Sequence, residues 1–217
     1  MPPAHTVLYF REELYRFMKG VQPLKIEVII GSTRQKRFAE KPANWIYGLA
    51  RKREELDVEL VDLRDYPLPF FDEPTSPARM EGKYSNDIVQ QWANKVAEAD
   101  GYIIVSPEYN HGYPAVLKNA FDHIYPEWNK KPVGFVSYGS TGGARAIEQL
   151  RLVAVELQMA PIRAAIHIPS QVYLAIVRPK EGDISNPFDT LDGQANAFLD
   201  QLIWWTRALK AAGEGEK

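Results

Sequence analysis

The sequence predicts an α/β domain built on an open parallel sheet, and two features of the 217-residue chain carry that prediction. Short runs of β-branched and apolar residues alternate with stretches of helical periodicity, which is the pattern of repeated βαβ units. The hydrophobic fraction of 45% is typical of a globular domain, and a chain of this length buries a full core. We therefore expect an extension over residues 1–24, followed by one large domain over residues 25–217.

Five strands are expected, at Ile26 to Ile30, Leu56 to Val61, Gly101 to Val105, Val133 to Ser137 and Ala164 to Ile168. The third strand is the most apolar and should therefore be central. Helices are expected at Phe38 to Glu55, Asp87 to Ala99, Pro114 to Asp122, Gly143 to Leu157 and Thr190 to Leu209. Because crossovers between parallel strands are right-handed, these elements predict a flavodoxin-like, doubly wound, five-stranded sheet with helices on both faces.

Three stretches do not belong to this pattern. In the extension, Arg11 to Met18 is expected to form a short helix packed on the domain. The stretch from Asp62 to Lys83 is rich in proline, which indicates a long surface connection, and long connections often carry function. The stretch from Tyr173 to Asp192 matches no motif, and we expect it to shape the substrate site.

Charge and residue usage exclude several classes of function. A net charge of -2 gives no general reason to bind nucleic acid or an anionic membrane. The absence of cysteine excludes disulfides, thiolate nucleophiles and sulfur-based zinc sites, so any redox activity needs a cofactor. The four histidines form no i, i+3 or i, i+4 pair, so we expect no metal site. Apolar runs are too short to span a bilayer and no signal-peptide pattern is found, so we expect a cytoplasmic protein.

The first loop expected at the ligand-binding edge is the run Gly31-Ser32-Thr33-Arg34-Gln35-Lys36-Arg37. Ligands of open parallel sheets bind beyond the carboxyl ends of the strands, where the strand order reverses. This loop offers backbone N–H groups, two hydroxyls and three cations just before a helix, which suits a phosphate dianion. It contains neither a Walker motif nor Gly-x-Gly-x-x-Gly. The alternative is a solvated basic turn.

Two further loops follow the third and fourth strands. The loop Ser106 to Pro114 combines a rigid proline, the flat ring of Tyr109 and the amide of Asn110, which are groups that suit a polar heteroaromatic ring. The loop Ser137 to Gly143 has three glycines, so its backbone N–H groups can approach a ligand and stabilise negative charge on a reduced ring. In both loops the alternative is a tight turn without a ligand.

Together these loops resemble the NADPH-dependent FMN reductase family, the flavodoxin-like branch that includes quinone, chromate and azo-dye reductases. The residues carrying the resemblance are Gly31-Ser32-Thr33-Arg34 with Arg37, Pro107-Glu108-Tyr109-Asn110, Leu117-Lys118-Asn119-Ala120 with Asp122, and Gly142-Gly143. The resemblance implies FMN as the bound cofactor, NADPH or NADH as the hydride donor and a small acceptor such as a quinone. It also implies a homodimer or homotetramer.

The resemblance further assigns a role to each loop. The FMN phosphate would be held by Ser32, Arg34 and Arg37. The ribityl chain and the ring would be lined by Pro107, Glu108, Tyr109 and Asn110. The pyrimidine side of the ring would be contacted by Ser137, Tyr138, Gly139, Ser140, Thr141, Gly142 and Gly143. No residue is expected to be catalytic, because the cofactor carries the reaction. Lys118 and Asp122, four residues apart on a helix, are expected to form a structural pair.

Two other functions are considered. A hydrolase using Ser140 with His111 or His167 would need glycine two residues before the serine, where Tyr138 stands. A flavodoxin-like electron carrier would bind FMN without oxidising NAD(P)H. Such carriers usually have strongly acidic faces, and the net charge of -2 argues mildly against one. Oxidation of NADPH by the purified protein would separate a carrier from a reductase.

Overall fold

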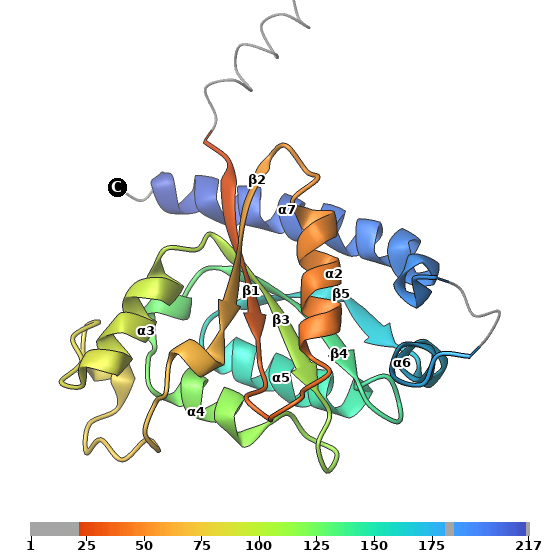
Figure 1. The fold of residues 1–217 in the computed structure, drawn as a ribbon. Coiled ribbons are helices and arrows are strands. Elements are labelled where there is room, and N and C mark those ends of the chain that lie inside the picture. The colour runs from red at the N-terminus through yellow and green to blue at the C-terminus, as the bar shows by residue number, and fades with distance from the viewer. Residues whose placement is uncertain (1–21, 181–184, 216–217) are drawn as a thin grey trace, which may run out of the picture.

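The computed structural model describes residues 22–180 and 185–215 and contains a five-stranded parallel sheet in the order β2-β1-β3-β4-β5 (Figure 1). Its strands are β1 (Leu24–Ile30), β2 (Leu56–Asp62), β3 (Gly101–Pro107), β4 (Pro132–Tyr138) and β5 (Ala160–Ile168). Every residue of β3 is buried, and this strand lies at the centre of the sheet as its apolar sequence predicts. The predicted flavodoxin-like fold is confirmed.

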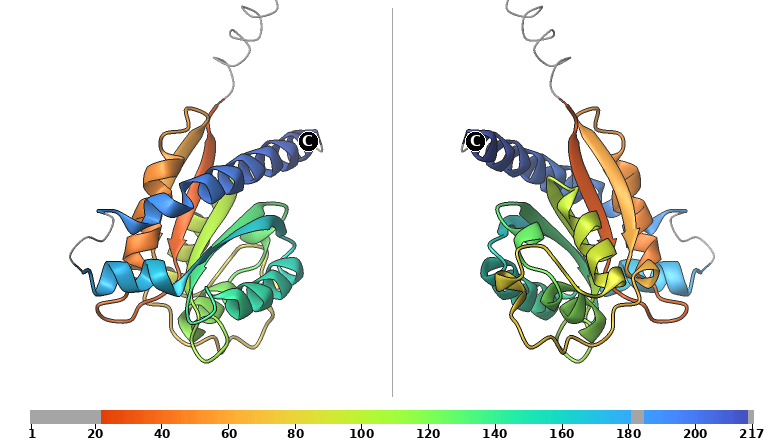
Figure 2. Two further views of the ribbon diagram at one scale, coloured as in Figure 1. Left: turned by 90° about the vertical axis from the view of Figure 1, so that its right-hand side faces the viewer. Right: turned by 90° about the vertical axis from the view of Figure 1, so that its left-hand side faces the viewer.

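Six α-helices cover the two faces of the sheet in the described part of the chain. They are α2 (Glu40–Ala50), α3 (Asp87–Ala97), α4 (Ala115–Asp122), α5 (Ala144–Glu156), α6 (Ser170–Val177) and α7 (Asp192–Glu214). The core on one face is shared with α2, α6 and α7, and the core on the other with α3, α4 and α5. Figure 2 shows the long α7 crossing the sheet obliquely. None of the described helices has the length and apolar character needed to cross a membrane.

Several elements differ from the sequence prediction. Helix α2 ends at Ala50 rather than Glu55, because the chain turns back into β2 through hydrogen bonds such as Leu56 N to Arg53 O (3.0 Å). Strand β5 begins at Ala160 rather than Ala164; its second residue, Pro161, is tolerated because β5 is an edge strand. Helix α6 was not predicted. The expected helix from Arg11 to Met18 lies outside the described residues.

The proline-rich connection after β2 is fastened to α4. The Asn119 side chain accepts from Phe71 N (3.0 Å) and donates to Pro69 O (2.7 Å), and His123 Nε2 also contacts Pro69 O (2.8 Å). The predicted pair on the same helix is confirmed, since Lys118 Nζ lies 2.7 Å from Asp122 Oδ2. The Leu117 to Ala120 motif therefore serves structure by fixing a long loop to the domain.

A buried carboxyl lies in the middle of β1. The Glu27 side chain is fully buried, and neither of its carboxylate oxygens has a hydrogen-bond partner among the described residues. Its neighbours Glu59 and Glu98 are paired with Lys95 and Lys25, so lysine ammonium groups occupy the space beside this acidic cluster. Burial raises the pKa of Glu27 to about 8, although Lys95 and other lysines act to lower it. Glu27 is therefore largely protonated at neutral pH.

We predict that Glu27→Gln raises the melting temperature at pH 8 and has little effect near pH 4.5. In the wild type, Glu27 keeps its proton in the folded state, whereas in the unfolded chain it loses that proton above the ordinary pKa of 4.5. The free energy of unfolding therefore falls between that pH and about pH 8, by at most about 1.4 kcal/mol per pH unit. Glutamine cannot ionise and removes this loss. Melting temperatures measured across this pH range test the prediction, with Glu59→Gln on β2 as the control. A difference in melting temperature between Glu27→Gln and wild type that does not change with pH would contradict it.

Candidate functional site

Three loops that follow β1, β3 and β4 meet at the carboxyl end of the sheet. They cover residues 31–37, 108–114 and 139–143. The first two touch where Ser32 Oγ lies 3.2 Å from Tyr109 Oη. The second and third are joined by Glu108, whose N–H donates to Tyr138 O (2.8 Å) and whose carboxylate accepts from Thr141 Oγ1 (3.4 Å). The loops that the sequence singled out therefore form one surface.

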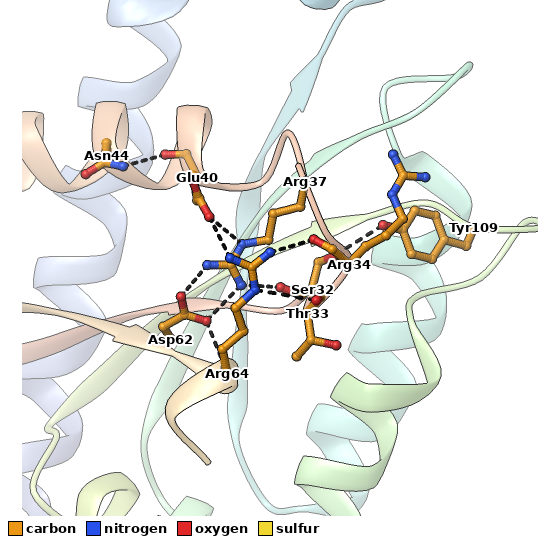
Figure 3. A network of polar contacts seen from close by, with 9 residues as sticks. All are labelled: Ser32, Thr33, Arg34, Arg37, Glu40, Asn44, Asp62, Arg64 and Tyr109. Atoms are coloured by element: carbon orange, nitrogen blue, oxygen red, sulfur yellow. Dashed lines mark hydrogen bonds and ion pairs between the residues drawn. The ribbon is translucent and has the colours of Figure 1, made fainter. Parts of the chain in front are cut away.

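Arg37 holds the first loop from inside (Figure 3). Its side chain is 1% exposed, and its guanidinium binds both carboxylate oxygens of Asp62, the carbonyl oxygen of Ser32 and Glu40 Oε1 (3.0 Å). Burial alone would raise the pKa of Asp62, but the hydrogen bonds from Arg37 and from Arg64 N outweigh burial and lower it. The expected phosphate ligand Arg37 is thus committed to protein partners, and we interpret it as a residue that shapes the loop.

Arg64, which the sequence analysis did not single out, holds the same loop from outside. It follows β2 and donates to the carbonyl oxygens of Thr33 (3.4 Å) and Arg34 (2.7 Å) and to Glu40 Oε1 (3.1 Å). Together with Arg37 it fixes three successive carbonyl groups of the loop. Its partners lie about thirty positions away in the sequence, so no local pattern marks this arginine as part of the site.

The donors left over in the first loop suit an anion. The backbone N–H groups of Ser32, Thr33 and Arg34 have no hydrogen-bond partner among the described residues. Helix α2 starts beside them at Ala39 without a side-chain cap, so its positive dipole end is also available. The Arg34 guanidinium has no carboxylate partner in the described chain and lies 5.6 Å from the centroid of the Tyr109 ring (Figure 3). This donor set fits a phosphate group.

The second loop turns sharply at its tip. Tyr109 and Gly112 exchange two backbone hydrogen bonds (2.8 and 3.0 Å), and Asn110 and His111 between them have φ of 50° and 70°. Two central residues with positive φ define a type I′ turn, a conformation that asparagine tolerates. Asn110 thus forms the exposed tip of the loop, and Pro107 is the buried last residue of β3. The turn leaves Tyr109 beside Ser32 and Arg34.

Glu108 joins the second and third loops through a buried ion pair. Its side chain is 3% exposed and accepts from the Arg145 side chain (Nε, 2.7 Å) and from Arg145 N (3.1 Å), at the start of α5. Burial would raise the pKa of Glu108, but the hydrogen bonds and charge of Arg145 outweigh it and lower the pKa. Arg145 also donates to Ser140 Oγ (3.1 Å) and contacts His111 Nε2 (2.8 Å). The sequence analysis did not identify Arg145, because only the folded chain brings it to Glu108.

The third loop needs glycines because neighbouring atoms approach its backbone too closely for a side chain. A Cβ atom at Gly143 would lie 1.9 Å from Ser137 Oγ, and Gly143 and Gly142 have φ of 75° and 64°. At Gly139 a Cβ atom would lie 2.8 Å from the Cβ of Glu108. These glycines allow the loop to pack closely against the end of β4 and against Glu108. The backbone N–H groups of the exposed residues Ser140 and Thr141 have no hydrogen-bond partner in the described chain.

Two residues of the same predicted group turn their side chains into the protein. Ser137 is buried, and its hydroxyl donates to Ser106 O (2.7 Å). The Tyr138 ring packs edge-on against Phe38 (centroids 4.8 Å apart) and lies nearly parallel to Tyr173 of α6 (6.5 Å). Burial raises the pKa of Tyr138, so its phenol stays neutral. These contacts bring α6, part of the stretch expected to shape the substrate site, to the edge of the loops.

A parallel sheet of order 2-1-3-4-5 is the flavodoxin-like arrangement, whose ligands bind beyond the carboxyl ends of the strands, where these three loops lie. Residues 24–172 match the family model described as NADPH-dependent FMN reductase. The chain therefore belongs to this family. Its cofactor is FMN and its electron donor is a reduced nicotinamide nucleotide.

Individual relatives agree with this assignment. An NAD(P)H-dependent FMN reductase of Schizosaccharomyces pombe is 42% identical over 158 residues, which cover 71% of this chain and 79% of that protein. A quinone reductase of Pseudomonas putida is 26% identical over 198 residues, or 88% of this chain and 98% of that one. The solved structure of FerB, a flavoenzyme NAD(P)H:(acceptor) oxidoreductase from Paracoccus denitrificans, matches with a TM-score of 0.62 at 22% identity, covering 82% of this chain and 97% of FerB. This last match supports the fold.

We predict that Gly143→Ala lowers the free energy of unfolding by about 1 to 3 kcal/mol, as overpacking does in cores, and weakens FMN binding. The added methyl group would collide with Ser137 and would require a left-handed conformation that alanine disfavours. Gly48→Ala is the matched control, because nothing lies within 4 Å of its Cβ position in α2 and alanine favours a helix. Thermal melts and FMN titration measure both effects. Equal stability of the two variants would contradict the role of Gly143.

Proposed function

We propose that this chain is an FMN-dependent oxidoreductase that transfers a hydride from NAD(P)H to a quinone or a similar small acceptor. The observation that carries the proposal is the set of N–H groups from Ser32 to Arg34 that have no hydrogen-bond partner among the described residues, in the loop that leads to the uncapped start of α2. Bound FMN accepts a hydride from the nicotinamide and gives it to the acceptor. The printed name of the Pseudomonas putida relative supports a quinone as the acceptor class.

Each loop has one proposed task in this function. The backbone of Ser32, Thr33 and Arg34, with the Arg34 guanidinium, binds the phosphate. Tyr109 and the turn at Asn110 line the ribityl chain and one side of the ring. The N–H groups of Ser140 and Thr141, which have no hydrogen-bond partner in the described chain, would donate to the pyrimidine side of the ring and stabilise negative charge there. The remaining charged groups position these donors, and none is proposed to react.

The assembly and the compartment are part of the same proposal. We propose a homodimer or homotetramer in the cytoplasm. The apolar side chains of Leu152 and Val155 on α5 are 74% and 63% exposed, which supports an interface between subunits on that side. The absence of cysteine is compatible with a reducing compartment.

The phosphate assignment predicts that Arg34→Ala weakens FMN binding by roughly 10- to 150-fold, the value of one charge-assisted hydrogen bond. Riboflavin has no phosphate, so its affinity should stay nearly unchanged. The melting temperature of the free protein should also stay unchanged, because Arg34 has no ion-pair partner among the described residues. Fluorescence titration with both flavins tests this, with Arg51→Ala at the far end of α2 as the control. Equal losses of FMN and riboflavin affinity would contradict the assignment.

The reaction itself predicts ping-pong kinetics. The purified protein with FMN should oxidise NADPH or NADH in steady state when a quinone is supplied. Donor and acceptor would use the same exposed side of the flavin in turn, so double-reciprocal plots at several quinone concentrations should give parallel lines. Intersecting lines, or turnover without flavin, would count against the proposal. Flavin binding without any NAD(P)H oxidation would favour an electron carrier.

A further inference from the structure

Helix α7 presents two neighbouring tryptophans to solvent. Trp204 and Trp205 are 62% and 37% exposed, and their ring centroids lie 5.2 Å apart. Trp204 borders a shallow hollow of about 540 Å³, whose other lining residues are Glu55, Asp200, Ile203, Arg207 and Ala208. Exposed aromatic surface rimmed by charged residues marks a contact site in soluble proteins. We call this surface the tryptophan face.

The chain enters the sheet beside the tryptophan face. Leu24 N donates to Glu55 O (2.9 Å), and the Glu55 carboxylate lies 3.6 Å from Arg207. Lys25 N donates to Asp100 Oδ2 (2.9 Å), which also accepts from Lys210 Nζ (2.7 Å). Both contacts tie the start of β1 to the last turns of α7, within about two turns of Trp204. In Figure 1 the start of β1 passes in front of this half of α7.

The sequence that leads into β1 carries an apolar stripe. In residues 1–21, apolar side chains occur at Val7, Phe10, Leu14, Phe17 and Val21, separated by alternating steps of three and four. This spacing puts them on one side of a helix. The positions between them also include Leu8, Tyr9, Tyr15 and Met18, and the charged residues Glu12, Arg16 and Lys19 would lie on the opposite side of such a helix. Such a stripe needs an apolar surface to cover it.

We propose that residues 7–21 cover the tryptophan face of α7 in the same chain. Strand β1 starts at Leu24 beside Glu55, which lines the same hollow as Trp204, so a contact made by the preceding residues is intramolecular and has a high effective concentration. Only residues 22 and 23 separate the segment from β1, and two residues span at most about 7 Å. The occupant is therefore the chain's own extension, which buries its apolar stripe against Trp204, Trp205 and the hollow beside them.

Cross-linking tests this contact directly, because the natural chain has no cysteine and introduced thiols are the only ones present. Met18→Cys is combined with Ala208→Cys, which lies in the hollow. The control combines Met18→Cys with Gln91→Cys, an exposed position of α3 at the opposite face of the sheet. Treatment of the FMN-loaded full-length protein with a short bismaleimide should link residues 18 and 208 within one chain, at least about tenfold faster than the control pair.

A second substitution shows whether the apolar stripe makes the contact. Leu14→Asp in the Met18→Cys, Ala208→Cys protein should lower the rate of cross-linking to that of the control pair. Its FMN content should stay unchanged, because the tryptophan face lies away from the flavin loops. Links formed between two chains would overturn the proposal in favour of a second copy as the occupant. Equal rates at residues 208 and 91, or a rate that Leu14→Asp leaves unchanged, would also overturn it.

Discussion

The buried ion pair between Arg37 and Asp62 is the interaction on which the site depends. Asp62 is the last residue of β2, and Arg37 ends the loop after β1, so the pair joins an edge strand to the loop that faces the ligand. The same guanidinium holds Ser32 O and Glu40, which fixes the start of α2 as well. If Asp62 were removed, the buried Arg37 guanidinium would keep Glu40 as a carboxylate partner but would lose its contact with the edge strand β2.

Most charged groups around the loops therefore serve to position backbone donors. Arg64 binds carbonyl oxygens of the first loop, and the pair of Glu108 and Arg145 joins the other two. In the first loop, Arg34 alone keeps a guanidinium without a carboxylate partner in the described chain. Anion recognition is thus assigned chiefly to main-chain N–H groups, whose placement depends on side chains that do not touch the ligand. Because most of these charged side chains bind other groups of the protein, a loop can contain more charged residues than residues that bind a ligand.

The sequence predicts the sheet, the strand positions and the three loops, because these follow from local periodicity and from where glycine and proline stand. It does not reveal Arg64 or Arg145, since their partners are distant along the chain and only the strand order brings them together. It does not reveal that Arg37 binds Asp62 and Glu40, because a cation in a loop gives no sign of whether it will be buried. The start of β5 was missed because Pro161 weakens a strand pattern that an edge position tolerates.

The ion pair between Glu108 and Arg145 affects the entropic cost and the rate of ligand binding. Because it ties the aromatic loop to the start of α5 through contacts within the protein, that loop loses little conformational entropy when a flavin binds. A preorganised site binds its ligand without a slow closing step, and differences in affinity then arise chiefly in the dissociation rate.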